Sequence, residues 1–254
     1  MSGFFHEAFF KPVFNLLIWL YNIIPGDDLG IAIIALTIVI KVILFPLSQK
    51  SIRSQRALQI LQPKIEALKK KYGKERERLA AEMMKLYKEQ KVNPLSSCLP
   101  LLIQLPFLFA VFRVFGRSLT EVPSELLYPF VMHPGELGTM FLSTIDLTVA
   151  APILGILAGA AQFYQTKQLM HKRAEVKTKE AKDENMMAMV NKQMMYMLPI
   201  MTVGFGFYFP GGLMLYWLVT TILTIAQQKL IFSKDDEKGD APATPKGGEQ
   251  HATP

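Results

Sequence analysis

The sequence has few of the residues that build disulfide-stabilised proteins, metal sites and nucleotide-driven motors. Its 254 residues include one cysteine, which excludes an intramolecular disulfide and any site with several thiolate ligands. The four histidines are dispersed along the chain, and neither a GxxxxGK[ST] nor a GxGxxG phosphate-binding loop occurs. The sequence therefore gives no sign of a cofactor, a metal site or a nucleotide-driven motor.

Charge is nearly absent from the long apolar stretches. Residues 29–47 and residues 194–232 each carry one charged side chain, whereas a soluble core alternates apolar and polar residues every two to four positions. Of the 28 lysines and arginines, 24 lie at 48–95, 167–192 and 229–254, beside the apolar stretches. The positive-inside rule accounts for this distribution, so the net charge of +7 does not indicate recognition of a nucleic-acid sequence. We expect a polytopic membrane protein.

The hydropathy pattern predicts an all-α polytopic membrane protein with five transmembrane helices. An amphipathic helix in the membrane interface precedes them, and an antiparallel helical hairpin in the cytosol separates the first two. The predicted segments are the interfacial helix at 3–25, a first span at 29–47, the cytosolic hairpin at 48–93, a second span at 94–112, an extracytosolic loop at 113–149, a third span at 150–166, a basic cytosolic loop at 167–193, a fourth span at 194–209, a fifth span at 213–232 and a disordered cytosolic tail at 233–254. Because basic residues gather on the cytosolic side, the N-terminus is predicted to lie outside and the C-terminus in the cytosol.

Two glycine patterns predict how the spans meet. Gly155 and Gly159, in the third span, have the small-xxx-small spacing that lets two helices approach closely. Pro210, Gly211 and Gly212 separate the fourth and fifth spans, and so short a connection predicts an antiparallel pair joined by a tight turn.

Lys41 is the most informative polar residue of the predicted spans. It lies in the cytosolic half of the first span, about 18 Å from its outer end at about 1.5 Å per residue. An ammonium at that depth costs about 2.5–3.5 kcal/mol unless water or a partner reaches it, and no Asp or Glu occurs in any predicted span. Two interpretations stay open: the side chain snorkels to the cytosolic head groups, or it lines a water-filled cavity open to the cytosol.

Other polar residues favour a cavity. Thr37 lies four residues before Lys41, on the same helical face. Further polar positions give the other spans a polar face, and Gln227 ends the stripe in the fifth span. The candidate groove residues are Lys41, Thr37, Gln104, Gln162, Tyr216, Thr220 and Thr224. The alternative for the uncharged members is interhelical hydrogen bonding, worth about 0.6–2 kcal/mol each.

Three long stretches carry a family resemblance. They read KVILFPLSQKSIRSQRALQILQPKI (residues 41–65), EMMKLYKEQKVNPLSSCLPLLIQLP (residues 82–106) and FYFPGGLMLYWLVTTILTIAQQKLI (residues 207–231). In order and spacing they resemble the YidC/Oxa/Alb family of membrane protein insertases, in the compact bacterial form without a large extracytosolic domain. The resemblance covers roughly residues 4–232.

The resemblance implies five helices around a hydrophilic groove that is open to the cytosol and to lipid and closed on the outside. It also implies a mobile cytosolic hairpin that helps to receive substrates. The groove residue of the family is usually arginine, five positions before the proline that ends the first span. Here that position is Lys41, before Pro46, which keeps the charge but loses the bidentate fork of arginine.

The expected function is that of a membrane protein insertase and chaperone of the bacterial cytoplasmic membrane. It would move short hydrophilic tails of client proteins through the groove and release their apolar segments into the lipid bilayer, alone or with the Sec translocon. The expected partners are nascent or newly made membrane proteins and the bilayer, and the Sec translocon, the ribosome and the signal recognition machinery are further candidates. No cofactor and no enzymatic activity are expected. A small-solute channel or transporter and a non-translocating assembly factor are the alternatives.

Overall fold

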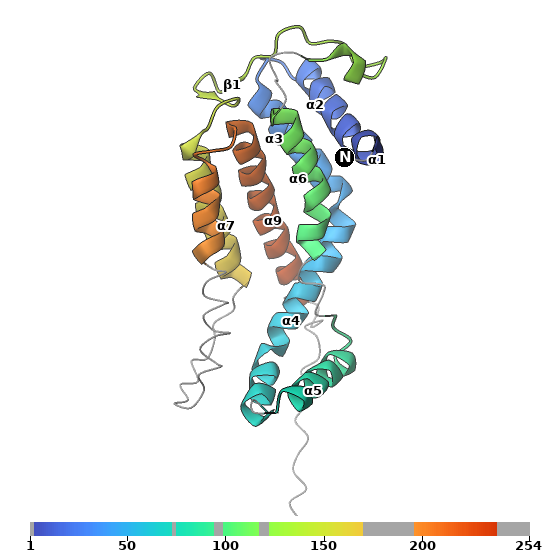
Figure 1. Ribbon diagram of the computed structural model, residues 1–254, viewed down its shortest axis with the longest axis vertical. Coiled ribbons are helices and arrows are strands. Elements are labelled where there is room, and N and C mark those ends of the chain that lie inside the picture. Colours follow the sequence, from blue (N-terminus) through green and yellow to red (C-terminus); the bar gives the residue numbers. More distant parts are fainter. Residues whose placement is uncertain (1–2, 73–74, 94–98, 117–121, 170–195, 238–254) are drawn as a thin grey trace, which may run out of the picture.

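The computed structural model describes residues 3–72, 75–93, 99–116, 122–169 and 196–237. These residues form a helical bundle, with a two-helix arm that projects from one end and a loop that covers the other (Figure 1). Buried apolar side chains from α2, α3, α6 and α9 make one continuous core. Most of the predicted basic loop at 167–193 and most of the predicted tail at 233–254 lie outside the described residues.

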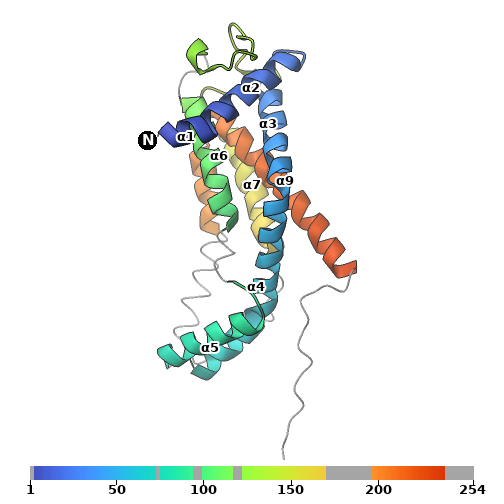
Figure 2. The same cartoon turned by 90° about the vertical axis from the view of Figure 1, so that its right-hand side faces the viewer.

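The N-terminal segment is a helical rod with one packed face. It comprises α1 (Gly3–Phe5), the π-helix η1 (His6–Phe10) and α2 (Lys11–Ile23). Phe10, Phe14 and Leu17 are buried at helical spacing, while Trp19 and Ile23 are exposed on the other side. The rod crosses one end of the bundle, at a steep angle to α3 and α6 (Figure 2).

The first bundle helix and the arm meet at a sharp change of direction. Asp28 caps α3 (Leu29–Ile43) by accepting a hydrogen bond from the Ile31 N–H at 3.1 Å. The next helix, α4 (Phe45–Tyr72), differs in direction from α3 by 70°, and α5 (Arg76–Glu89) packs against it. The direction changes at Leu44, a few residues before the predicted boundary at 47, because Pro46 fits the first turn of a new helix better than the interior of an old one.

The remaining helices are α6 (Leu99–Gly116), α7 (Pro152–Leu169), an unlabelled helix Tyr196–Phe205 and α9 (Gly211–Glu237). In the described part of the chain, the segment Gly211–Ser233 is long and apolar enough to cross a bilayer by itself, and α3 with α4 would make a second, bent span. Gln104–Phe115 and Tyr196–Phe205 are apolar but shorter. The arrangement of five spans therefore stays a prediction. α9 also runs on to Glu237, into the predicted tail, since no proline or glycine interrupts residues 233–237.

Glycines bring α7 and the Tyr196–Phe205 helix into close contact, which confirms the prediction from their spacing. A Cβ atom on Gly155 would lie 2.6 Å from the Cα of Gly206. A Cβ on Gly159 would lie 2.5 Å from the Val203 side chain and 2.9 Å from the Pro199 carbonyl oxygen. Neither position has room for a side chain, so the two backbones touch.

The turn into α9 differs from its prediction. Gly211 and Gly212 begin α9 rather than forming the turn, and the chain reverses before Pro210. The Gly212 N–H donates to the Leu147 carbonyl at 2.9 Å, and a Cβ there would lie 2.3 Å from the Phe115 ring. Glycine is needed at this position because a ring of α6 packs directly against the start of α9.

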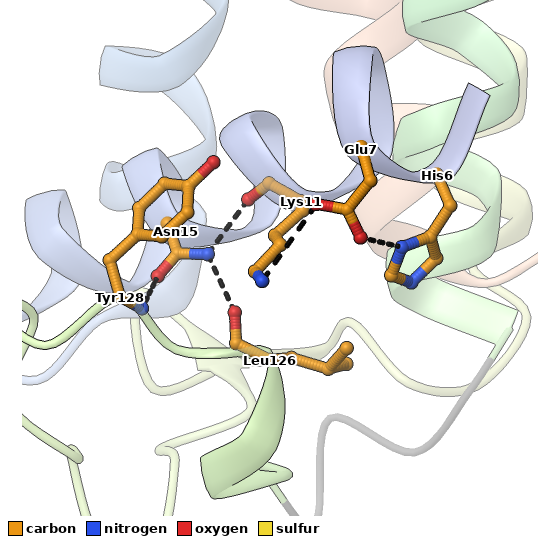
Figure 3. Close-up of polar contacts among 6 residues, drawn as sticks. All are labelled: His6, Glu7, Lys11, Asn15, Leu126 and Tyr128. Carbon is orange, nitrogen blue, oxygen red and sulfur yellow. Dashed lines mark hydrogen bonds and ion pairs between the residues drawn. The ribbon is translucent and has the colours of Figure 1, made fainter. Parts of the chain in front are cut away.

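The loop at 122–149 covers the end of the bundle where α9 begins. It contains the short helix η3 (Ser124–Leu126) and a hairpin of β1 (Met140–Phe141) and β2 (Ile145–Asp146). Buried Asn15 of α2 holds this loop (Figure 3). Its amide donates to the carbonyls of Leu126 and Lys11, both at 2.8 Å, and its oxygen accepts from the Tyr128 N–H at 2.6 Å. One buried side chain thereby satisfies both a donor and an acceptor of the loop backbone.

Candidate functional site

A cleft lined by apolar and polar side chains lies between α3, α4, α6, α7 and α9. Its volume is about 280 Å³. The apolar residues in its wall are Leu44, Ile52, Leu108 and Trp217. The hydroxyl and amide residues are Ser48, Gln55, Gln104, Gln165, Tyr216, Thr220, Thr221, Thr224, Gln227 and Gln228. Among these described lining residues Lys41 carries the one formal charge, so the cleft offers many neutral hydrogen-bonding groups and a single ammonium.

The Lys41 ammonium lies inside the cleft. Lys41 is in the last turn of α3, and its Nζ donates to the Thr224 hydroxyl of α9 at 2.7 Å. The Thr224 hydroxyl donates in turn to the Thr220 carbonyl at 2.6 Å. The hydrogen bond fixes the position of the lysine side chain. Because the Thr224 hydroxyl is uncharged, this contact does not neutralise the positive charge. In a medium of low dielectric constant such a charge attracts an anion strongly.

A second contact joins α6 and α9 further along the cleft. The Gln104 amide donates to the hydroxyl oxygen of Tyr216, which is 1% exposed. Tyr216 lies two turns before Thr224 on the same stripe of α9. The structure thus brings together five of the candidate residues: Lys41, Gln104, Tyr216, Thr220 and Thr224.

The other two candidates lie elsewhere. Thr37 is buried, and its hydroxyl donates to the Ile33 carbonyl of its own helix at 2.6 Å. The Gln162 side-chain oxygen accepts a hydrogen bond from the Thr202 hydroxyl, which links α7 to the Tyr196–Phe205 helix. Gln162 thus has the interhelical role that was its alternative, and neither residue lines the cleft.

Several residues that line the cleft were not among the candidates predicted from the sequence. Ser48 and Gln55 lie in the segment expected to form the hairpin, and Gln165 lies at the end of the predicted third span. Thr221 and Gln228 are seven residues apart on α9, on a stripe that also includes Thr224. The spacing of Thr221, Thr224 and Gln228 by three and four residues was the sequence signal that could have identified Thr221 and Gln228.

The cleft is suited to binding by hydrogen bonds and charge. Among the described residues, no three His, Cys, Asp or Glu side chains are gathered in a way that could hold a metal ion. The lining supplies amides and hydroxyls, which donate and accept hydrogen bonds, and one ammonium, which attracts an anion.

Apolar helices that enclose a lysine and neutral polar side chains are typical of an integral membrane protein. Residues 19–238 match the model of the 60Kd inner membrane protein family. The chain belongs to this family, and is accordingly a bacterial inner-membrane protein.

Similar proteins come from several bacteria. The membrane protein insertase YidC of Mannheimia succiniciproducens is 36% identical over 233 residues, which cover 90% of this chain and 37% of that protein. The YidC insertase of Haemophilus influenzae is 35% identical over 231 residues, covering 90% of this chain and 37% of the relative. That of Streptomyces avermitilis is 33% identical over 229 residues, covering 83% and 52%. The chain therefore spans about a third to a half of the length of these relatives.

Proposed function

We propose that this protein inserts client proteins into the bacterial cytoplasmic membrane. A short hydrophilic tail of the client enters the cleft beside Lys41, while the client's apolar segment moves along α7 and α9 into lipid. The observation that carries the proposal is the ammonium of Lys41, held at 2.7 Å from Thr224 inside a cleft of neutral polar groups. The names of the relatives, each a membrane protein insertase, support the same reaction.

The physical basis is a lower cost of moving a polar tail. A peptide group moved from water into hydrocarbon without a hydrogen-bond partner costs several kcal/mol, roughly 2–7. Hydroxyls, amides and water in the cleft replace those partners, and the Lys41 ammonium offsets the cost of an acidic side chain. Partitioning of the client's apolar segment, worth about 25 cal/mol per Å² of buried apolar surface, then drives the net transfer. No covalent step is required.

The exposed surface of the bundle fits a lipid path. α7 exposes Ile153, Ile156 and Leu157, and the neighbouring Tyr196–Phe205 helix exposes Ile200. In this proposal these side chains face the acyl chains, the arm formed by α4 and α5 lies in the cytosol and receives clients, and the loop at 122–149 closes the outer end. The N-terminus lies outside and the C-terminus in the cytosol, and the protein works alone or with the Sec translocon.

A charge series at Lys41 tests the proposal. The assay is insertion of a single-span client with a short acidic tail into proteoliposomes, scored by protection of the tail from protease. Lys41→Arg should insert the client like the wild type, whereas Lys41→Glu should lose most insertion, because a carboxylate repels the tail. Lys229→Glu is the matched control, since Lys229 lies on the same helix as Thr224 but outside the cleft, over the Tyr164 ring at 5.2 Å.

The outcomes separate the mechanism from its alternatives. Equal insertion by all variants would refute the electrostatic part and leave Lys41 without a role in client transfer. No insertion by any variant, together with ion or solute flux through the same vesicles, would favour a channel. Loss of activity on removal of residues 54–92, with no effect of Lys41 substitutions, would favour an assembly factor that works through the arm alone.

A further inference from the structure

We propose that amide side chains at the α4 end of the cleft form a subsite for the peptide backbone of the client's hydrophilic segment. The subsite consists of Gln55 of α4, Gln165 of α7, and Gln227 and Gln228 of α9, which all line the cleft. The inference rests on the proposed insertase function and names the part of the client that this end of the cleft recognises. Lys41 selects for acidic side chains, and the amides bind the main chain whatever its sequence.

The position of the amides places them next to Lys41. Gln228 follows Thr224, the partner of Lys41, by one helical turn, which is about 6 Å along α9. Gln55 and Gln165 reach the same cleft from two other helices, so amides surround this end on three sides. A tail bound at Lys41 therefore has to pass among them.

The side-chain oxygen of Gln228 is a buried hydrogen-bond acceptor that no described residue pairs. Gln228 is 1% exposed, and its Oε1 has no hydrogen-bond partner among the residues that the structure describes. Its neighbour Gln227 is also buried and donates to the Phe45 carbonyl only at 3.5 Å. Buried polar atoms in folded proteins are nearly always paired, and a peptide N–H entering the cleft is a donor that would pair this one.

Amides are the side chains that match a peptide backbone. Each has a donor and an acceptor in one plane, as a peptide unit does, and none has a charge that would discriminate between tails. The α9 residues that line the cleft, from Tyr216 to Gln228, are spread over about 18 Å of that helix, the length of five to six residues of extended peptide at about 3.3 Å each. One short extended tail can therefore contact both Lys41 and the subsite.

The test couples a change in the client backbone to a change in the subsite. Two synthetic single-span clients have the same short neutral tail, and in one of them the backbone nitrogens of the tail are methylated. Methylation removes the N–H donors and leaves the side chains unchanged. Because a methylated backbone is easier to desolvate, it should insert better unless the protein binds the N–H groups. We expect wild-type protein to insert the methylated client about two- to tenfold less well, as for one lost hydrogen bond.

The variant Gln228→Met keeps the length of the side chain and removes the amide. It should insert both clients to a similar extent, because the lost bond is the one that methylation removes. Gln162→Met is the matched control, as its amide lies on α7 outside the cleft, and it should discriminate between the clients like the wild type. If Gln228→Met does not fold, Gln55→Met and Gln165→Met provide the same comparison from the other two helices.

The outcomes separate this inference from the proposed function. If methylation and Gln→Met each reduce insertion by the same factor whether or not the other is present, the backbone subsite is overturned. In that case, insertion of the unmethylated client by the wild type leaves the insertase function intact. Failure of the wild type to insert either client would overturn both.

Discussion

Replacement of Asn15 by alanine should release the loop at 122–149 from the bundle. Asn15 is 2% exposed and makes two hydrogen bonds to the loop backbone, to the Leu126 carbonyl at 2.8 Å and from the Tyr128 N–H at 2.6 Å. Asn15→Ala removes both bonds and leaves two partly buried backbone groups without partners. An unpaired buried group costs about 1–3 kcal/mol, and partial burial places each group in the lower part of that range, so the loop should lose roughly 2–4 kcal/mol of local stability.

Hydrogen exchange of the protein in lipid nanodiscs measures this loss. The informative amide is that of Val131, which donates to the Tyr128 carbonyl at 2.9 Å and is not one of the groups that bond to Asn15. Its protection reports whether the loop stays folded rather than the loss of one particular bond. A decrease of 2–4 kcal/mol corresponds to exchange that is about 30- to 1,000-fold faster.

Asn22→Ala is the matched control. Asn22 lies on the same helix and donates to the Met132 carbonyl of the same loop at 2.7 Å, but this bond is exposed to solvent. Water replaces an exposed partner, so its loss should change exchange only a few-fold. Equal acceleration in the two variants would refute the reasoning, because burial would then have no effect on the cost.

Three further predictions concern other parts of the structure. Gly155→Ala should destabilise the protein by about 1–3 kcal/mol, because the added Cβ would lie 2.6 Å from the backbone of the facing segment. The control is Gly204→Ala, whose Cβ would have no atom within 4 Å and which should be neutral or slightly stabilising. Thermal melts in detergent measure both. Hydrogen bonds from the backbone and hydroxyl of Thr148 lower the pKa of Asp146 below its usual value. Their contribution should be present above about pH 4 and lost as pH falls through the lowered pKa, and Asp146→Asn should remove this acid-dependent increase in loop exchange. Arg56→Gln should widen the spin-label distance distribution between α5 and α9, because Arg56 donates to the last apolar turn of α9 at 2.9 Å.

The sequence predicted the helices better than the directions they take. Hydropathy and turn residues placed the predicted third and fifth spans within a few residues of α7 and of the start of α9. The first span was predicted to end at residue 47, whereas α3 ends at Ile43, because Pro46 is compatible both with the end of one helix and with the first turn of the next. Tertiary packing decides at which residue the first helix ends, and the periodicity of apolar residues does not report on tertiary packing.

For a related reason, the sequence pointed to some of the residues that line the cleft and not to others. A 3.6-residue period shows which side chains share a face, and Tyr216, Thr220 and Thr224, which were placed on one face of a helix, all line the cleft. It does not show what that face meets. Gln162 faces Thr202 rather than the cleft, and Thr37 bonds to its own helix, although both fit the polar pattern. Gln55 was missed because the charged segment around it indicated a helix outside the membrane.

Two adjacent residues of α4 make the arm and the cleft one structural unit. Gln55 lines the cleft, and Arg56 donates to the Phe232 carbonyl at 2.9 Å with its guanidinium 4.9 Å from the centre of the Phe232 ring. A movement of α4 that breaks the Arg56 contact must also move Gln55, since the two share one helix backbone. Under the proposed function, a client that displaces the arm therefore also changes the lining of the cleft. The proposal then needs no further path through the bundle to couple the arm to the cleft.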